Sequence, residues 1–308
     1  MYSLLNPSYI GWVHSLTYGT KMPRVSPEQV ASSAVALPPL AEQRAIAAFL
    51  DRETAKIDAL VAKKERLIEL LQEKRTALIT RAVTKGLDPT VPMKDSGVEW
   101  LGEIPVYWEV KRLKYVAPAR MSKLEVKPDD AVYVGLEHVE SWTGRLLLDN
   151  QPETVESVVG AFKAGDVLFG KLRPYLAKVA RPDFDGVCTS EILPLRPGAE
   201  CSQSFLMYAL LNKPFIDWLD SLTCGTKMPR VSPGQVLDSF VALPPLPEQR
   251  AIAAFLDRET AKIDALIAKV REAIERLKEY RTALISAAVT GKIDVREGRE
   301  EHIEAVSP

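Results

Sequence analysis

The chain has 308 residues, of which 46% are hydrophobic and 26% are charged, and its formal net charge at pH 7 is −1. This composition is typical of a soluble globular protein. The charge excludes a uniformly basic surface, so any binding to nucleic acid has to use a local basic patch. The three cysteines form no CxxC pair, the three histidines are isolated, and no apolar run approaches the length of a membrane span. We therefore expect a cytoplasmic protein with no metal site, no disulfide framework and no membrane anchor.

The chain opens with residues 1–36, which contain the string GTKMPRVSP at 19–27, and the same string returns at 225–233. Shifting the sequence by 206 residues extends this match without gaps from Met1 through most of the following helix. Residues 102–206 have no second copy. A period of this length indicates a duplicated domain rather than a solenoid. We interpret residues 1–36 as the tail remnant of a first domain whose front part is missing.

Residues 37–88 are predicted to contain the first of two long helices, and residues 241–294 contain the second. Between Glu42 and about Arg81 there is no Gly or Pro, and apolar residues recur at heptad spacing. Two such helices favour an antiparallel coiled coil, within one chain or between two chains, over separate amphipathic helices on independent cores. The residues predicted for the helix-pairing or subunit interface are Leu50, Ile57, Leu60, Leu67, Leu71, Leu78, Leu256, Ile263, Leu266, Val270, Leu277 and Leu284.

The segment 89–240 has a different sequence pattern, in which short apolar runs are separated by turn residues. Strands are predicted at 131–137, 166–172, 175–182 and 186–197, and helices are predicted within 203–222. We therefore predict an α+β fold, with one mixed α/β domain at 89–240 and the two long helices beside it. The last residues, 295–308, are predicted to form a flexible tail.

The window FGKLRPYLAKVARP at 169–182 is a candidate for nucleic-acid contact because it carries four cations and no acid. Cations on a strand pair neutralise phosphates, and arginine reads guanine bidentately. A solvated strand face without a ligand is the alternative. The candidate DNA-binding residues of this window are Lys171, Arg173, Tyr175 and Lys178.

The repeated string at 225–233 is a second candidate, because a Gly–Thr–Lys turn presents backbone N–H groups and a cation to phosphate. A purely structural turn is the alternative. This string adds Thr226, Lys227 and Arg230 to the candidate DNA-binding residues. The matching Lys21 and Arg24 of the first copy are poorer candidates, because the domain that they would close is absent.

No catalytic constellation can be assembled from this sequence. The segment GDVLFGKL at 165–172 fits the pattern of a phosphate-binding loop, but Leu172 stands where Ser or Thr is needed for magnesium. No Ser/His/Asp set, HExxH motif or pair of nuclease carboxylates is recognisable. We predict no catalytic residue, no metal and no cofactor in this chain.

Several motifs resemble those of the specificity subunits of type I restriction–modification systems. They are LPPLPEQRAIAAFLDRETAKIDALIAK and RTALISAAVTGKID in the second helix, MKDSGVEWLGEIPVYWEVKRLKYV at 93–116, GDVLFGKLRPYLAKV at 165–179, and GTKMPRVS. Together the motifs cover nearly the whole chain. The helix motif with its preceding LPPLPEQ is highly specific.

This resemblance implies a DNA-recognition subunit without a catalytic site. In that family, two target recognition domains read the two halves of a split double-stranded DNA site, and the antiparallel conserved helices act as a ruler between them. Modification (methyltransferase) subunits dock on the helices and methylate adenine, and restriction/translocase subunits add translocation and cleavage. The resemblance therefore places S-adenosylmethionine, ATP and Mg on partner subunits.

The chain departs from this pattern because only 89–240 is a complete recognition domain, so we expect it to read one half-site. Pairing of two chains as a homodimer through the long helices would make the target an inverted repeat. Exposed Leu4, Leu5, Ile10 and Trp12 would form an apolar patch that favours association. The alternatives are a non-functional remnant, a donor gene fragment for recombination, and a coiled-coil scaffold that binds protein but not DNA.

Overall fold

The computed structural model describes residues 1–19, 23–120, 122–125, 127–128, 130–148, 158–225 and 227–295. The chain forms two compact units, one from the described residues of Met1–Leu70 and Ala265–Pro308 and the other from Leu71–Asp264. The boundary between the two units crosses both long helices. The domain bounds predicted from the sequence repeat lie elsewhere and stay a prediction. Of the predicted C-terminal tail, only Val295 lies within the described residues.

Two long helices, α3 (Leu40–Lys85) and α8 (Leu246–Val289), contain 46 and 44 residues. Each begins after a Leu-Pro-Pro sequence and runs without interruption to a glycine with positive φ, Gly86 at 74° or Gly291 at 70°. A glycine adopts this left-handed conformation without strain, which is why it ends helices. At 1.5 Å per residue, each helix is about 65–70 Å long.

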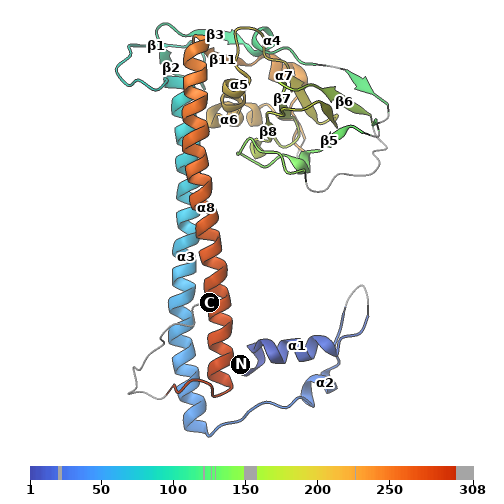
Figure 1. The fold of residues 1–308 in the computed structure, drawn as a ribbon, viewed down its shortest axis with the longest axis vertical. Coiled ribbons are helices and arrows are strands. Elements are labelled where there is room, and N and C mark those ends of the chain that lie inside the picture. Colours follow the sequence, from blue (N-terminus) through green and yellow to red (C-terminus); the bar gives the residue numbers. More distant parts are fainter. Residues whose placement is uncertain are drawn as a thin grey trace. The chain divides into compact units, whose positions relative to one another are not determined.

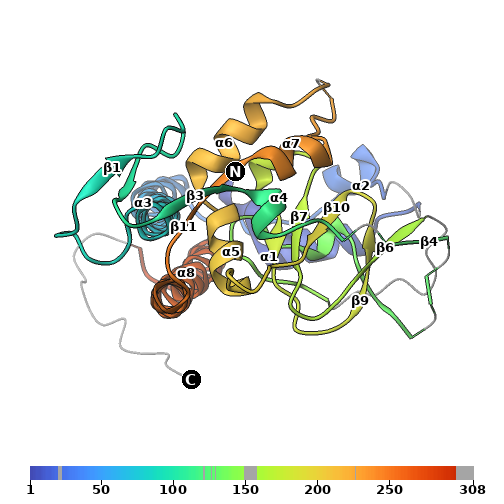
Figure 2. The same ribbon diagram turned by 90° about the horizontal axis from the view of Figure 1, so that it is seen from above.

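The long helices pair antiparallel within the chain, which confirms the predicted coiled coil (Figure 1). In the first unit, Leu50 packs in one cluster with Leu284, and Asp58 accepts from Arg281 at 3.0 Å. In the second unit, Arg75 bonds Asp264. Figure 2 looks along the helices and shows them side by side.

One of the two predicted heptad rows lies in the buried seam between the helices. The other buried row is displaced by one residue from its predicted position. The row containing Leu50 is inside, and its buried members are Leu50, Ile57, Leu71, Leu256, Ile263, Val270 and Leu284, with Leu78 and Leu277 partly buried. Leu60, Leu67 and Leu266 lie outside this seam and are exposed by 42%, 40% and 44%, so their place in a subunit interface stays a prediction. The second row instead runs through Thr54, Val61, Ile68 and Arg75, and through Thr260, Ile267, Ile274 and Arg281 in the other helix.

This register yields a matched pair of stability predictions. Leu50→Ala should lower the free energy of unfolding by about 2–5 kcal/mol, because it opens a cavity at a side chain that is 0% exposed. Leu60→Ala, ten residues along the same helix, should cost less than about 1 kcal/mol. Urea unfolding of the two variants measures both values, and equal costs would contradict the register.

The remaining helices are short. They are η1 (Tyr2–Leu5), α1 (Pro7–Ser15), α2 (Pro27–Ala31), α4 (Leu113–Val116), η2 (Leu136–His138), η3 (Pro174–Leu176), α5 (Gln203–Leu210), α6 (Lys213–Ser221) and α7 (Pro233–Asp238). None of the helices in the described ranges combines the length and the apolar character needed to cross a membrane.

The strands lie in the second unit. They are β1 (Met93–Asp95), β2 (Glu103–Pro105), β3 (Glu109–Arg112), β4 (Lys123–Leu124), β5 (Val132–Val134), β6 (Val159–Phe162), β7 (Val167–Gly170), β8 (Val179–Ala180), β9 (Gly186–Thr189), β10 (Ile192–Leu195) and β11 (Phe240–Leu243). Within the described residues they form four small sheets, with the orders β1-β2, β10-β7-β8, β11-β3 and β4-β6-β9-β5. Neighbours pair antiparallel except β5 and β9, which are parallel.

One apolar core joins this mixed α/β domain to the adjoining ends of the long helices. Trp108, Phe205 and Phe215 are each at most 1% exposed, and they share a cluster with Ile79 of α3 and Leu256 of α8. The α+β class is confirmed. The predicted strand at 175–182 is mostly a turn, because η3 occupies 174–176 and β8 contains only two residues.

The sequence repeat is also a structural repeat at the level of local elements. Helix α1 matches α6, and α2 matches α7 at the 206-residue spacing. The same capping box, Ser26 with Gln29 and Ser232 with Gln235, begins α2 and α7. Among the described residues around each copy of GTKMPRVSP, an equivalent β-bridge, Tyr18–Arg24 or Cys224–Arg230, precedes the same helix start.

Candidate nucleic-acid interface

The two predicted basic windows lie next to each other in the structure. The loop that follows β7 bonds to the repeated string through its backbone, since Arg173 N donates to Pro229 O at 2.7 Å and Val231 N donates to Lys171 O at 3.1 Å. A β-bridge between Leu172 and Arg230 lies between these two bonds. Candidate residues more than fifty positions apart in the sequence therefore share one region of the domain.

Arg173 has an unusual backbone conformation in this loop. Its φ and ψ are 50° and 63°, in the left-handed region, and Ala177 at the other end of η3 has the same conformation. Non-glycine residues adopt this region at a cost and persist there only when neighbouring contacts fix them. Here the bond from Arg173 N to Pro229 O fixes the loop, and the Arg173 side chain is exposed.

Two more candidates are accessible on the same pair of loops. Tyr175, in the turn η3, is 44% exposed, so its ring is available for stacking. Lys227 is exposed, and Thr226 lies outside the described residues. Exposed Arg173, Tyr175 and Lys227 therefore supply two cations and an aromatic ring.

Arg230 is not a free cation, because its Nη2 donates to Glu191 Oε1 at 2.7 Å. Glu191 also accepts, through its backbone carbonyl, from Lys171 N at 2.9 Å. Glu191 therefore orients the Arg230 guanidinium through its carboxylate and bonds the loop of Lys171 through its backbone.

Lys178 has internal partners. Its ammonium donates to the carbonyls of Leu136 and Val139, each at 2.7 Å, and burial lowers the pKa of Lys178 below its ordinary value. These bonds give Lys178 a structural role in holding the turn 136–139, and its contact with DNA stays a prediction.

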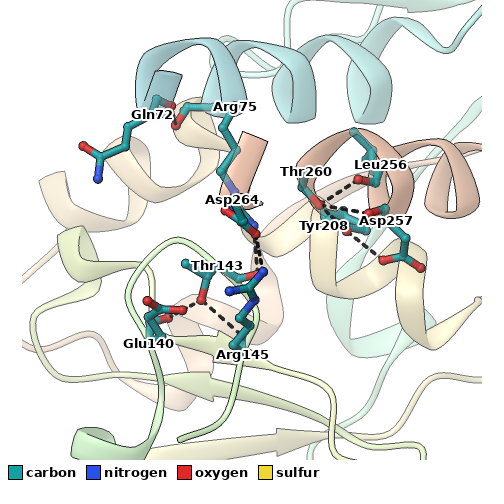
Figure 3. A network of polar contacts seen from close by, with 11 residues as sticks. Gln72, Arg75, Glu140, Thr143, Arg145, Tyr208, Leu256, Asp257, Thr260 and Asp264 are labelled. Carbon is teal, nitrogen blue, oxygen red and sulfur yellow. Dashed lines mark hydrogen bonds and ion pairs between the residues drawn. The ribbon is translucent and has the colours of Figure 1, made fainter. Parts of the chain in front are cut away.

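A second polar cluster joins the turn at 140–145 to the long helices (Figure 3). Asp264 of α8 bonds Arg75 of α3 and accepts from Arg145 at 2.5 Å, while Arg75 also donates to Thr143 O at 3.0 Å. The side chains of Arg75 and Asp264 are only 6% and 14% exposed. One partly buried carboxylate thus holds two arginines, one from the helix and one from the turn at 140–145.

The turn at 140–145 is shaped for this contact. Gly144 has a φ of 81°, and a Cβ at this position would lie 2.7 Å from the sulfur of Met207. Glycine adopts this φ without strain, and any larger residue would also have to displace the end of the Met207 side chain. The position of Arg145 over Asp264 therefore depends on Gly144.

Tyr208 and Asp257 form the neighbouring part of this cluster (Figure 3). Tyr208 Oη donates to Asp257 at 2.8 Å and lies 3.4 Å from the Thr260 hydroxyl, and burial raises the pKa of Tyr208 to about 12. Arg181 of the basic window donates to the same Asp257 at 2.8 Å. Arg181 and Arg145 thus both bind α8.

Sequence reasoning missed Glu191, Arg145 and Asp264 as partners of the basic residues. The sequence does contain a signal for the pair Arg75 and Asp264. The repeat holds an arginine and an aspartate at the matching positions, Arg281 and Asp58, at the 206-residue spacing. Nothing in the sequence marks Glu191 as the partner of Arg230. Among the residues that the structure describes, no cluster of three or more His, Cys, Asp or Glu side chains has metal-binding geometry.

Comparison with known families and proteins gives one consistent result. Residues 105–276, more than half of the chain, match the family described as "Type I restriction modification DNA specificity domain". The type I restriction enzyme EcoDI specificity subunit of Escherichia coli is 27% identical over 312 residues, covering 94% of this chain and 68% of that protein. The MjaVIII specificity subunit of Methanocaldococcus jannaschii is 28% identical over 307 residues, covering 92% and 68%.

Solved structures share the fold. A chain from a study of complex assembly and conformational transition of the type I R-M system gives a TM-score of 0.67 at 18% identity, covering 89% of this chain and 66% of its own length. The HsdS subunit from Thermoanaerobacter tengcongensis gives 0.51 at 17% identity, covering 95% and 69%. This chain therefore spans about two thirds of the length of these similar proteins.

Proposed function

Because the chain belongs to the type I restriction–modification DNA specificity family, we propose that its mixed α/β domain, residues 89–240, reads one half of a bipartite DNA site. The chain is a specificity subunit, a DNA-recognition component without a catalytic role of its own. Adenine methylation with S-adenosylmethionine and ATP- and Mg-dependent restriction belong, in this proposal, to separate modification and restriction subunits. The complex acts in the cytoplasm.

The observation that carries this proposal is the meeting of the two basic windows. Arg173 and Lys227 are exposed cations on loops that bond to each other, and Tyr175 is exposed beside them. The cations neutralise phosphates, and Arg173 supplies the planar fork that reads a guanine edge. Arg230, directed by Glu191, is a further contact residue when DNA competes for its guanidinium.

The long helices set the distance between half-sites and bind the modification subunits. Three exposed leucines support this part of the proposal, since Leu60, Leu67 and Leu266 lie outside the seam between α3 and α8. Exposed apolar residues on a rigid helix pair are typical of a protein–protein interface. Association of two chains would give two identical recognition domains related by a two-fold axis, whose target is an inverted repeat.

Sequence selection from a random duplex pool, at several salt concentrations, tests DNA reading directly. We expect one enriched sequence, and an affinity that falls steeply with salt because phosphate contacts release counterions. Arg24→Ala, at the position that matches Arg230 in the first copy, is the control and should leave selection unchanged. Salt-independent binding without enrichment would instead support a scaffold that binds only protein.

A further inference from the structure

Arg230 is a candidate DNA-binding residue whose backbone is held on both sides. It forms β-bridges with Cys224 and with Leu172. Its guanidinium donates through Nη2 to Glu191 Oε1 at 2.7 Å, and the Arg230 side chain nevertheless remains 53% exposed. The pair therefore presents a guanidinium that is fixed at one edge and accessible to solvent.

Glu191, the partner of Arg230, is itself fixed and mostly buried. It lies in the turn between β9 and β10, its carbonyl accepts from Lys171 N at 2.9 Å, and its side chain is 23% exposed. Its second carboxylate oxygen, Oε2, is buried and has no hydrogen-bond partner among the described residues. Within the described ranges the carboxylate therefore depends on Arg230, and a ligand that pulled the guanidinium away would leave a mostly buried charge unpaired.

The guanidinium can serve Glu191 and a ligand at the same time, because it carries five N–H donors in a rigid planar fork. The bond from Nη2 to Glu191 uses one donor and fixes the direction of the fork. A guanine edge accepts two bonds, through O6 and N7, from a correctly oriented fork. The Glu191 bond thus supplies this orientation in advance and reduces the side-chain entropy that is lost on binding.

The carboxylate also weakens the attraction of Arg230 to phosphate. Phosphate contacts depend on positive charge, which Glu191 offsets at this position, whereas guanine O6 and N7 are uncharged acceptors. The exposed side chains of Arg173 and Lys227 have no carboxylate partner within the described ranges and keep their full attraction to the DNA backbone. A paired arginine beside such cations is suited to reading a base rather than to holding the backbone.

We infer that Arg230 reads a guanine in the major groove and that Glu191 is the positioning residue that makes this contact specific. Glu191 keeps its bond while the guanidinium binds O6 and N7, and it does not touch the DNA itself. The guanine is distinct from the one that Arg173 contacts. This inference rests on the proposed function, because it assigns a base to a residue of the same interface.

Removing the charge of Glu191 in the full chain tests its role. Glu191→Gln keeps the shape of the side chain but leaves Arg230 with its full charge and a weaker guide. The scrambled duplex should then bind about 2- to 5-fold more tightly, the range of one exposed ion pair, while discrimination in favour of the selected duplex falls. On the scrambled duplex, the slope of log affinity against log salt should steepen by up to about 0.9, which is the value for one added phosphate contact.

Asp185→Asn is the matched control, because it makes the same change in net charge at the other end of β9. Asp185 accepts from Lys163 Nζ at 2.7 Å, and both side chains are 57% exposed. This variant should leave both the discrimination and the salt slope as they are in the original chain. A merely structural role of Glu191 would instead weaken binding to both duplexes and lower the midpoint of urea unfolding.

Substituted duplexes test the base. Each guanine of the selected duplex is replaced in turn by 7-deazaguanine, which lacks the N7 acceptor. At one position the replacement should weaken binding of the original chain by about 5-fold or more, and it should have no further effect on Arg230→Ala. Arg173→Gly should remain sensitive at that same position, since its missing side chain contacts a different guanine.

Three results would overturn the inference while leaving the proposed function intact. They are a selected sequence without guanine, a set of 7-deazaguanine effects that Arg230→Ala leaves unchanged, and equal weakening of both duplexes by Glu191→Gln. A chain that enriches no sequence would overturn the proposed function together with the inference. If Glu191→Gln does not fold, the 7-deazaguanine series with Arg230→Ala still decides whether Arg230 reads a guanine.

Discussion

Asp264→Ala should lower the free energy of unfolding of the unit Leu71–Asp264 by about 3–5 kcal/mol, because removing one partner of a buried ion pair leaves the other charge uncompensated. The charge left without its carboxylate is that of Arg75, whose side chain is only 6% exposed and which then keeps the carbonyl of Thr143 as its partner. Urea unfolding, monitored through hydrogen exchange of the core amides of this unit, measures the loss of unfolding free energy.

Asp58→Ala is the matched control, since Asp58 occupies the same position of the repeat and pairs with Arg281. The Asp58 and Arg281 side chains are 57% and 35% exposed, so water screens the pair and the expected cost is below about 1 kcal/mol. Comparable costs at both positions would contradict the role of Asp264 as the link between the turn at 140–145 and the long helices.

Arg173→Gly should weaken specific DNA binding by about 1–3 kcal/mol, which is the range for one bidentate contact with a base. Glycine adopts the φ of 50° found at this position without strain, so the loop keeps its backbone and loses only the cation. Titration of the selected duplex and of a scrambled duplex measures the loss and shows whether it is specific.

Arg173→Lys separates charge from shape at this position. Lysine keeps the phosphate attraction but lacks the planar fork, so binding to both duplexes should persist while discrimination between them falls. A variant without the cation that still discriminates as well as the original chain would exclude Arg173 from base reading.

Much of the fold could be predicted from the sequence because the repeat is gapless and the long helices lack Gly and Pro. The same capping residues recur at Ser26 and Ser232, and helices begin at both. The seam was predicted correctly where it is apolar, through Leu50 and Ile57. Its other row contains Thr54 and Arg75, which are buried because their side chains bond Leu50 O and Asp264. Periodicity of apolar residues cannot detect such positions.

The sequence predicts which residues belong to the candidate interface but not which partners their side chains bond. The sequence identified both basic windows, and the structure brings Arg173 and Pro229 together. It also gives Lys178 two carbonyl partners and Arg230 a carboxylate. These partners lie about forty residues away and depend on how small sheets pack. Arg173 and Ala177 adopt left-handed backbone conformations although neither is a glycine, so the sequence contains no turn signal there. For this reason the prediction of a strand at 175–182 was wrong.

Mapping methylated adenines in DNA from cells that co-express this chain with its modification subunit tests the central claim most directly. We expect a single bipartite motif with two inverted half-sites, and loss of that motif when the Arg173→Gly variant replaces the original chain. Methylation at no defined motif, or a motif that Arg173→Gly leaves unchanged, would contradict the assignment of DNA reading to this face of residues 89–240.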